Sequence, residues 1–358
     1  MKKNFRQILH RKDYWTYFVV TAAFIVLTVL SNTGVLKRAH TALLVPVCCY
    51  IAAALALNLC VGILGELSLG HAGFMSIGAF SGIIVSQSLM DVIPNAVIRL
   101  LIAIVVGAVL AGIFGFLIGI PVLRLKGDYL AIVTLAFGEI IKDLITCLIV
   151  GVDSKGLHVI FNASGSKTVA DLNLAEGGRT IIQGAQGAVG TTTISTFTAG
   201  FILILVVLFV VQNLVYSCTG RAIMAIRDNR IAAESCGLNV TGYKMTAFAI
   251  SAALAGAAGA LYGLNYSSVV ATKFNFNTSI LILVYVVLGG LGNIQGTIVA
   301  AALLYVLPEL LRAFSDYRML VYAIVLILVM LATNNRKLAQ FMSRFTKKKV
   351  KEEEQPNV

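Results

Sequence analysis

Long hydrophobic stretches separated by short polar segments make up most of the chain. A helix needs roughly 20 apolar residues to cross a bilayer, and these stretches are continuously apolar rather than alternating as barrel strands do. Because lipid offers no hydrogen bonds to the backbone, only helices or closed barrels can span it. The pattern predicts ten helical spans, at residues 14–30, 41–65, 71–90, 97–120, 129–150, 195–216, 246–264, 278–289, 297–314 and 318–333.

Two of these stretches differ from the rest. The stretch at 71–90 is rich in glycine, and the stretch at 278–289 is short. Each could cross the membrane fully or enter and leave it on one side. The basic residues before 14–30 resemble the start of a signal peptide, but no clear small-residue cleavage site follows, so we predict an uncleaved first span.

Composition supports a polytopic membrane protein. Of 358 residues, 58% are hydrophobic and 12% are charged, whereas a typical soluble domain has about 25% charged residues. A soluble domain of this composition would expose too much apolar surface, and the same figures exclude a disordered chain. Six cysteines in a chain of this length exclude a disulfide-stapled scaffold. None has metal-ligand spacing, so we expect them to serve as packing residues.

Basic residues set the predicted orientation. The net charge is +12, and cytoplasmic loops of membrane proteins gather Lys and Arg; this explains the charge better than nucleic-acid binding. With both termini cytoplasmic, the inside segments hold 18 of the 28 basic residues. The predicted organisation is a basic cytoplasmic N-terminus and a transmembrane domain with one long external and one long cytoplasmic loop, followed by a charged cytoplasmic tail whose lysines can contact anionic lipid. These parts are 1–13, 14–333 with loops 151–194 and 217–245, and 334–358.

Two glycine-rich breaks, at 65–80 and 289–296, each join two apolar stretches. Glycines there permit close helix packing or an interrupted helix that lines a transport path, and the sequence leaves both open. His71, in the first break, could carry protons or bind a ligand, but a lone histidine beside a glycine-rich turn more often has a structural role. The external loop 151–194 is either a small folded cap or a flexible loop.

Charged residues inside the stretch 129–150 form a second candidate feature. Glu139, Lys142 and Asp143 share one helix face by their spacing. Ionisable groups at such a position are expected to face protein or water. They could line a path or form an internal ion pair that locks neighbouring helices, and we favour the ion pair.

The cytoplasmic loop 217–245 predicts two short amphipathic helices that end at Gly237, a residue type that commonly follows a helix. The small side chains of Ala232 and Ala233 would let a partner approach closely. Such exposed helices are what a peripheral motor needs to push on. The chain has no phosphate-binding loop with the required spacing and no hydrolase or zinc-protease motif, so we expect no enzyme activity and assign any ATP hydrolysis to another chain.

These features together resemble the permease subunits of branched-chain amino-acid ABC importers, specifically the longer of the two permease types. The resemblance rests on 58–62, 65–80, 127–141, 220–263, 287–293 and 307–312, and covers most of 45–150 and 217–333. It implies an all-α integral membrane protein with the ABC importer permease fold and about ten spans containing glycine-interrupted segments. It also implies a location in the bacterial plasma membrane.

The family implies partners. They are a second permease, two cytoplasmic ATPases that carry ATP and Mg, and an external binding protein that delivers leucine, isoleucine or valine; this chain itself would hold no cofactor or metal. The stretch 231–237 is similar to the family's coupling motif, with Ile231 where the motif has Glu. The external loop 151–194 is longer than the family's usual loop.

The sequence therefore predicts alternating access powered by the partner ATPases. Candidate ATPase-coupling residues are Arg221, Arg227, Ala232, Ala233, Glu234 and Gly237. Candidate translocation-path residues are Glu66, Gly70, His71, Gly73, Thr134, Glu139, Asp143, Gly290 and Asn293. The alternatives are a permease of the same type for urea, amides or other amino acids, an ion-coupled secondary carrier in which Glu139, Asp143 or His71 titrates, and a membrane enzyme that uses Glu66 and His71.

Overall fold

The computed structural model describes residues 11–33, 38–125, 127–153, 156–162, 169–172, 174, 178–311, 320, 323–324 and 327. The chain divides into two compact units, residues 1–302 and 303–358. Nearly all described elements belong to the first unit. Residues 1–10, most of the predicted span at 318–333, and the predicted tail at 334–358 lie outside the described residues.

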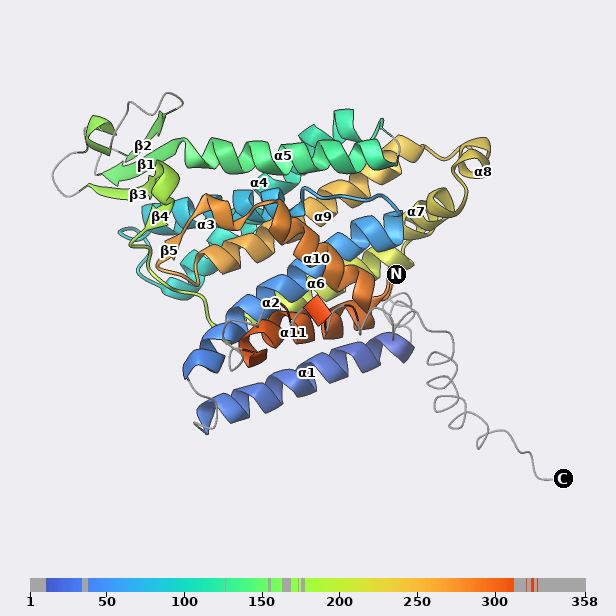
Figure 1. Cartoon of the computed structure of the whole chain (residues 1–358), viewed down its shortest axis with the longest axis horizontal. Coiled ribbons are helices and arrows are strands. Elements are labelled where there is room, and N and C mark those ends of the chain that lie inside the picture. Colours follow the sequence, from blue (N-terminus) through green and yellow to red (C-terminus); the bar gives the residue numbers. More distant parts are fainter. Residues whose placement is uncertain are drawn as a thin grey trace, which may run out of the picture. The chain divides into compact units, whose positions relative to one another are not determined.

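Long helices make up most of the first unit (Figure 1). Several begin at side chains that cap them: the Asn95 side chain accepts a hydrogen bond from Val97 N, and the Thr196 side chain accepts one from Ala199 N. The long helices are α1 (Arg11–Asn32), α2 (Arg38–Asn58), α3 (His71–Ser88), α4 (Ala96–Val122), α5 (Asp128–Thr146), α6 (Phe197–Tyr216), α9 (Val240–Gly263) and α10 (Phe276–Gly289). The helix α11 (Ile294–Leu310) crosses the boundary between the two units.

The centre of the first unit is the close packing of α3, α4 and α9. A Cβ atom added to Gly78 would lie 2.0 Å from the Gly256 carbonyl oxygen, and one added to Gly256 would lie 2.3 Å from the Ala111 Cβ atom. A Cβ on Gly259 would lie 2.0 Å from the Met75 carbonyl oxygen. The helix backbones therefore touch through small residues, which is how membrane helices gain dispersion contacts without a hydrophobic driving force.

Five helices are long and apolar enough to cross a membrane, among the residues that the structure describes. They are His40–Leu64, Ala96–Val122, Phe197–Tyr216, Val240–Gly263 and Ala271–Gly289, and two shorter apolar helices are Thr16–Ser31 and Ile294–Leu310. The predicted spans at 71–90 and 129–150 do not reach this standard. The first corresponds to α3, which is mostly buried, and the second to α5, which carries Glu139, Lys142 and Asp143.

The prediction of an all-α protein is wrong in one region. Among the residues that the structure describes, five strands form an antiparallel sheet in the order β2-β1-β3-β4-β5. The predicted span at 129–150 ends early, because α5 stops at Thr146 and the β-branched residues that follow enter a strand, as their propensity favours. The strands are β1 (Leu148–Asp153), β2 (Gly156–Phe161), β3 (Arg179–Gln183), β4 (Ala188–Val189) and β5 (Ser268–Val269).

The predicted external loop 151–194 is therefore folded in its described parts. Strand β1 pairs with both β2 and β3. Strand β4 pairs with β5, placing Ala188 opposite Val269, so the loop is tied to the segment that joins α9 to α10. Of the two alternatives left open by the sequence, the described residues favour a small folded cap.

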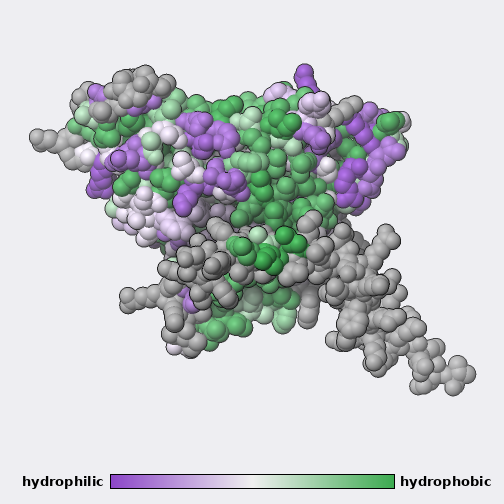
Figure 2. Space-filling view, in the orientation of Figure 1, coloured by the Kyte–Doolittle hydropathy of each residue, from purple (hydrophilic) through white to green (hydrophobic). Residues whose placement is uncertain are grey.

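The sheet and the pair of short helices α7 (Cys218–Asp228) and α8 (Arg230–Ser235) lie at opposite ends of the long helices (Figure 1). Figure 2 shows hydrophobic surface between a polar region near the sheet and another at α7 and α8. Helix α4 exposes apolar side chains along its length, including Leu101 at 56%, Val105 at 60% and Val109 at 54%. This is the surface expected of a helix facing lipid.

Gly256→Ala tests the close packing of α4 and α9. The added methyl group would collide with Ala111 and the Gly107 carbonyl oxygen, and overpacking of this kind costs about 1–3 kcal/mol. We expect the melting temperature of the purified protein to fall by several degrees. Ile113→Val, which changes one methyl on a side chain 49% exposed, should leave it unchanged. Equal melting temperatures for the two variants would contradict the packing described here.

Candidate functional site

The two short helices of the loop 217–245 are held by well-formed caps. The Ser217 side chain accepts from Gly220 N at 3.1 Å, and the Asn229 side chain accepts from Ala232 N at 3.1 Å. Helix α8 ends with Gly237 at φ +80°. Its N–H donates to the Glu234 carbonyl oxygen, and Leu238 N donates to the Ala233 carbonyl oxygen, the two bonds of a Schellman motif. The predicted helices and their end at Gly237 are confirmed, and the last residues of the predicted loop form the first turns of α9, which begins at Val240.

One face of α8 is exposed and the other packs on the protein. Ala233 is 5% exposed and joins a cluster with Ile226 and Val240. Its small size therefore serves internal packing, contrary to the prediction that it receives a partner. Ala232 and Glu234 are exposed, Arg230 pairs with Glu234 at 2.9 Å, and Ile231 is 78% exposed.

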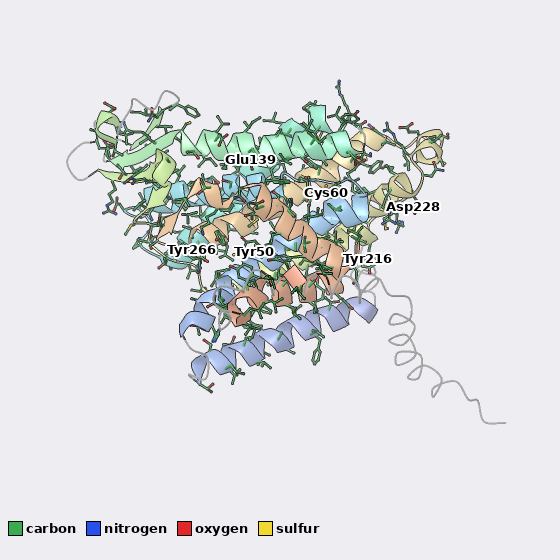
Figure 3. The ribbon with its side chains drawn as sticks, in the orientation of Figure 1. Tyr50, Cys60, Glu139, Tyr216, Asp228 and Tyr266 are labelled. Carbon is green, nitrogen blue, oxygen red and sulfur yellow. The ribbon has the colours of Figure 1, made fainter. Side chains whose placement is uncertain are left out.

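Arg227 connects α7 to the turn that precedes the first glycine-rich break. Its guanidinium Nη1 donates to the Gly62 carbonyl oxygen at 3.0 Å, and the same side chain pairs with Asp228 at 2.9 Å. Gly62 lies in η1 (Leu59–Leu64), a π-helical turn that continues α2, and such turns often occur at functional positions. Asp228 and Cys60 lie toward the same end of the molecule (Figure 3). Arg221 instead bonds the Tyr216 carbonyl oxygen at 3.3 Å, so it fixes α7 to α6.

The segment just before the first glycine-rich break contacts the second break at this point. The Asn58 side-chain oxygen accepts a hydrogen bond from Gly292 N at 2.8 Å. A Cβ atom on Gly62 would lie 2.2 Å from Gly292 N, so the two backbones are in direct contact. Gly290 takes φ +92° and Asn293 accepts from Gly296 N at 3.2 Å, which shapes the turn before α11. The second glycine-rich break is therefore in direct contact with the segment that precedes the first break.

Glu66, which follows η1, pairs with a lysine of α9. Lys244 Nζ donates to Glu66 Oε1, and the two side chains are 10% and 15% exposed. In the sequence, Lys244 is one of the basic residues of the loop predicted to be cytoplasmic. Its burial follows from the start of α9 at Val240, which places residue 244 within the helix. The pair joins the first glycine-rich break to α9.

Gly70, Gly73 and Thr134 form a packing contact between α3 and α5. A Cβ on Gly70 would lie 2.1 Å from the Thr134 carbonyl oxygen, and one on Gly73 would lie 2.9 Å from the Gly138 Cα atom. The Thr134 hydroxyl accepts from Leu69 N at 3.0 Å. For these residues the structure favours tight packing over an open path.

The charged cluster of α5 joins two helices. Lys142 donates to Glu139 and lies 3.4 Å from Asp143. Glu139 also accepts from Phe276 N at 2.8 Å, where a carboxylate stabilises the first turn of α10. Asp143 is 72% exposed. The arrangement agrees with the favoured ion pair that locks neighbouring helices; Figure 3 shows Glu139 along α5.

His71 is buried at the start of α3, 2% exposed. The backbone N of the next residue, Ala72, donates to Ser279 Oγ of α10 at 3.1 Å. Within the described residues, Nε2 of His71 has no hydrogen-bond partner. Its burial between helices matches the structural role, and the ion-carrier role stays a prediction. Groups of three His, Cys, Asp or Glu that could hold a metal are absent from the described part of the chain.

Lys244, Asn58 and Gly62 are the residues of this region whose roles sequence analysis missed. The signal for Asn58 was present, since a lone asparagine within an apolar stretch of membrane protein needs hydrogen-bond partners. The sequence could not show that its partner is Gly292, which is more than two hundred residues away.

Comparison with known proteins gives a consistent result. The family model described as "Branched-chain amino acid transport system / permease component" matches residues 40–330. The high-affinity branched-chain amino acid transport system permease proteins LivM of Escherichia coli and Salmonella typhimurium are each 36% identical over 295 residues, covering 79% of this chain and 66% of the relative. The match thus spans slightly less than two thirds of those relatives.

A more distant relative is archaeal. The probable branched-chain amino acid transport permease protein LivM of Methanocaldococcus jannaschii is 28% identical over 219 residues, covering 60% of this chain and 57% of that protein. No solved structure matches the chain significantly.

The buried pair Glu66–Lys244 gives a stability prediction. Lys244→Met leaves the Glu66 carboxylate buried without its partner, and breaking such a pair costs about 3–5 kcal/mol. We expect a large fall in the melting temperature of the purified protein. The double variant Glu66→Gln with Lys244→Met removes both charges and should recover most of the loss. A double variant as unstable as Lys244→Met, or more so, would show that the two groups do not act as a pair.

Proposed function

Because the chain belongs to the family of permease components of branched-chain amino acid transport systems, we propose that it is the transmembrane permease subunit of an ATP-driven importer for leucine, isoleucine and valine. The proposal is supported by the 36% identity to the E. coli LivM permease over most of this chain. The proposed activity is movement of the amino acid across the membrane, with no chemical change to it.

The proposed assembly contains a second, dissimilar permease, two cytoplasmic ATPases that carry ATP and Mg, and an external binding protein. The exposed face of α8, with Ile231 and the Arg230–Glu234 pair, supports an ATPase contact at this end. In this chain an exposed isoleucine stands where the coupling motif has a glutamate, so the proposed contact gains apolar burial in place of a charge. Lipid would cover the apolar face of α4.

We further propose a multi-pass protein of a bacterial plasma membrane, with about ten spans and both termini cytoplasmic. The distribution of basic residues supports this orientation. The folded sheet and the helices α7 and α8 lie at opposite ends of the long helices, as the proposed external and cytoplasmic sides require. Helix α3, which is mostly buried, would cross beside other helices. In α5, the Glu139 carboxylate is bound by Lys142 and by Phe276 N, which compensates for its distance from water.

One observation carries the proposed mechanism: Arg227 of α7 is hydrogen-bonded to Gly62, and the region around Gly62 is bonded to Gly292 through Asn58. A displacement of α7 and α8 by an ATPase would therefore pull on η1 and, through Asn58 and Gly292, on the second glycine-rich break. Movement there would open the path to one side of the membrane and close it to the other. Arg227 transmits this movement, and contact with substrate is not required of it.

The contacts of the charged residues in α5 support an ion-coupled carrier less well than an ATP-driven importer. The candidate titrating groups of such a carrier are Glu139, Asp143 and His71, but Glu139 is bound by Lys142 and by Phe276 N, and Asp143 is exposed. His71 is buried, and its role as an ion carrier stays a prediction. Urea, amides or other amino acids as cargo would keep the architecture and change only the substrate.

Transport by the purified complex tests the function. Proteoliposomes that hold this chain with its second permease and ATPases should accumulate labelled leucine only with internal ATP and added binding protein. Valine and isoleucine should compete. Uptake that needs an ion gradient and no ATP would overturn the ATP-driven proposal. ATP-dependent uptake competed by urea or another amino acid, and not by valine, would replace the substrate.

Arg227→Ala tests the transmission step. Loss of the bond to Gly62 should lower leucine uptake about tenfold, a typical coupling free energy between sites, while ATP hydrolysis by the assembled complex stays within about twofold. Arg124→Ala removes another exposed arginine from a segment predicted to be cytoplasmic and should change neither quantity. If Arg227→Ala lowers uptake and hydrolysis equally, Arg227 serves assembly rather than transmission.

A further inference from the structure

A pocket lies at the end of the first unit that bears the sheet, where the C-terminal end of α3 meets strands β1, β3 and β4. Its volume is about 360 Å³, which is within the range of small-molecule sites. Charged and polar side chains line it together with apolar ones from the strands. None of the candidate path residues takes part in it.

Charges of both signs face this pocket. Arg179 of β3 and Asp91, which follows α3, both line it, and Arg179 Nη2 lies 3.7 Å from Asp91 Oδ1. The pair is long, and its side chains are 58% and 70% exposed, so it contributes little to stability. The planar guanidinium of Arg179 is suited to bind a carboxylate through two parallel hydrogen bonds.

A third charged group in the pocket wall, Asp153, already has partners within the protein. Asp153 is 1% exposed and lies 3.1 Å from His158 Nε2, and its other oxygen accepts from Gly156 N at 3.1 Å. It shapes the wall and leaves Arg179 and Asp91 as the charges that a ligand can reach.

The rest of the wall is apolar. Val152, Ile181 and Val189 line the same pocket, and Ile181 is 2% exposed while Val189 is 41% exposed. A ligand that suits these surroundings carries one positive group, one negative group and an aliphatic side chain. Such a ligand placed between Arg179 and Asp91 would replace one long ion pair by two.

We propose that this pocket is an external receiving site for the zwitterion of an aliphatic α-amino acid, a site that rests on the proposed importer function. The carboxylate binds Arg179, the ammonium group binds Asp91, and the side chain lies against Val189. The pocket wall is bonded to the segment that joins α9 to α10, because Thr191 Oγ1 donates to the Tyr266 carbonyl oxygen at 2.7 Å. Tyr266 lies between α9 and α10, toward the sheet (Figure 3). An amino acid released by the binding protein would thus first bind in this pocket, at the end of the long helices that bears the sheet.

The test measures labelled leucine binding by equilibrium dialysis, using the purified membrane complex without its binding protein. We expect saturable binding of leucine. Its analogues 4-methylpentanoate, which lacks the ammonium group, and 3-methylbutylamine, which lacks the carboxylate, should be poor competitors. Arg179→Gln and Asp91→Asn should each weaken binding at least about tenfold, a fold-change in the range typical of hydrogen bonds to charged groups. Lys273→Gln, at an exposed lysine outside the pocket, should not change it.

A second pair of variants tests the pocket by filling it. Val189→Trp should abolish binding, and Val159→Trp, at a 54% exposed position of β2 outside the pocket, should not. Absence of saturable binding, or binding unchanged in Arg179→Gln and Val189→Trp, would overturn the site. ATP-dependent leucine uptake by the same wild-type complex separates the two proposals: uptake without binding at this pocket rejects only the site, and no leucine uptake rejects the importer function.

Discussion

This structure depends on direct contacts between backbones, which are possible only where glycine has no side chain. At Gly78, Gly256 and Gly259 they bring three helices together, and at Gly62 they join two segments that are far apart in the sequence. Lipid gives no hydrophobic reason for helices to associate. The fold is therefore held by dispersion and hydrogen bonds that only such close approach permits. The same contacts transmit force, because a Cβ-free interface has no flexible side chain to absorb a displacement.

The few charges of the membrane domain serve the same connections. Lys244 joins α9 to the segment after η1, and Glu139 joins α5 to the first turn of α10. Arg227 joins α7 to η1. Each is costly to place away from water, and each binds two elements that would otherwise meet only through apolar contacts. In this account the charges fix which helices move together, while substrate selection belongs to other residues.

The sequence predicted those features that depend on local patterning. Apolar stretches located most long helices, and Gly237 marked the end of α8 because a left-handed residue is needed there. It did not predict the sheet, since β1 continues an apolar stretch that resembles a span until Thr146 ends the helix. For the candidate site, the sequence predicted individual residues but not the contacts between them. Glu66 and Arg227 were named, but their partners Lys244 and Gly62 are set by tertiary contacts, for which one sequence holds no local signal.

We would measure the distance between α8 and the turn before α11, because it tests most directly whether these two elements move as one rigid body. Spin labels at the native exposed Cys236 and at Leu291→Cys would be measured by pulsed electron spin resonance, with Cys147 and Cys218 changed to Ser, in the assembled complex with and without ATP. A third label at Val159→Cys on β2 gives the reference. We expect an unchanged distance from 236 to 291 and a changed distance from 291 to 159. A changed first distance with an unchanged second one would show that α8 and this turn do not move together.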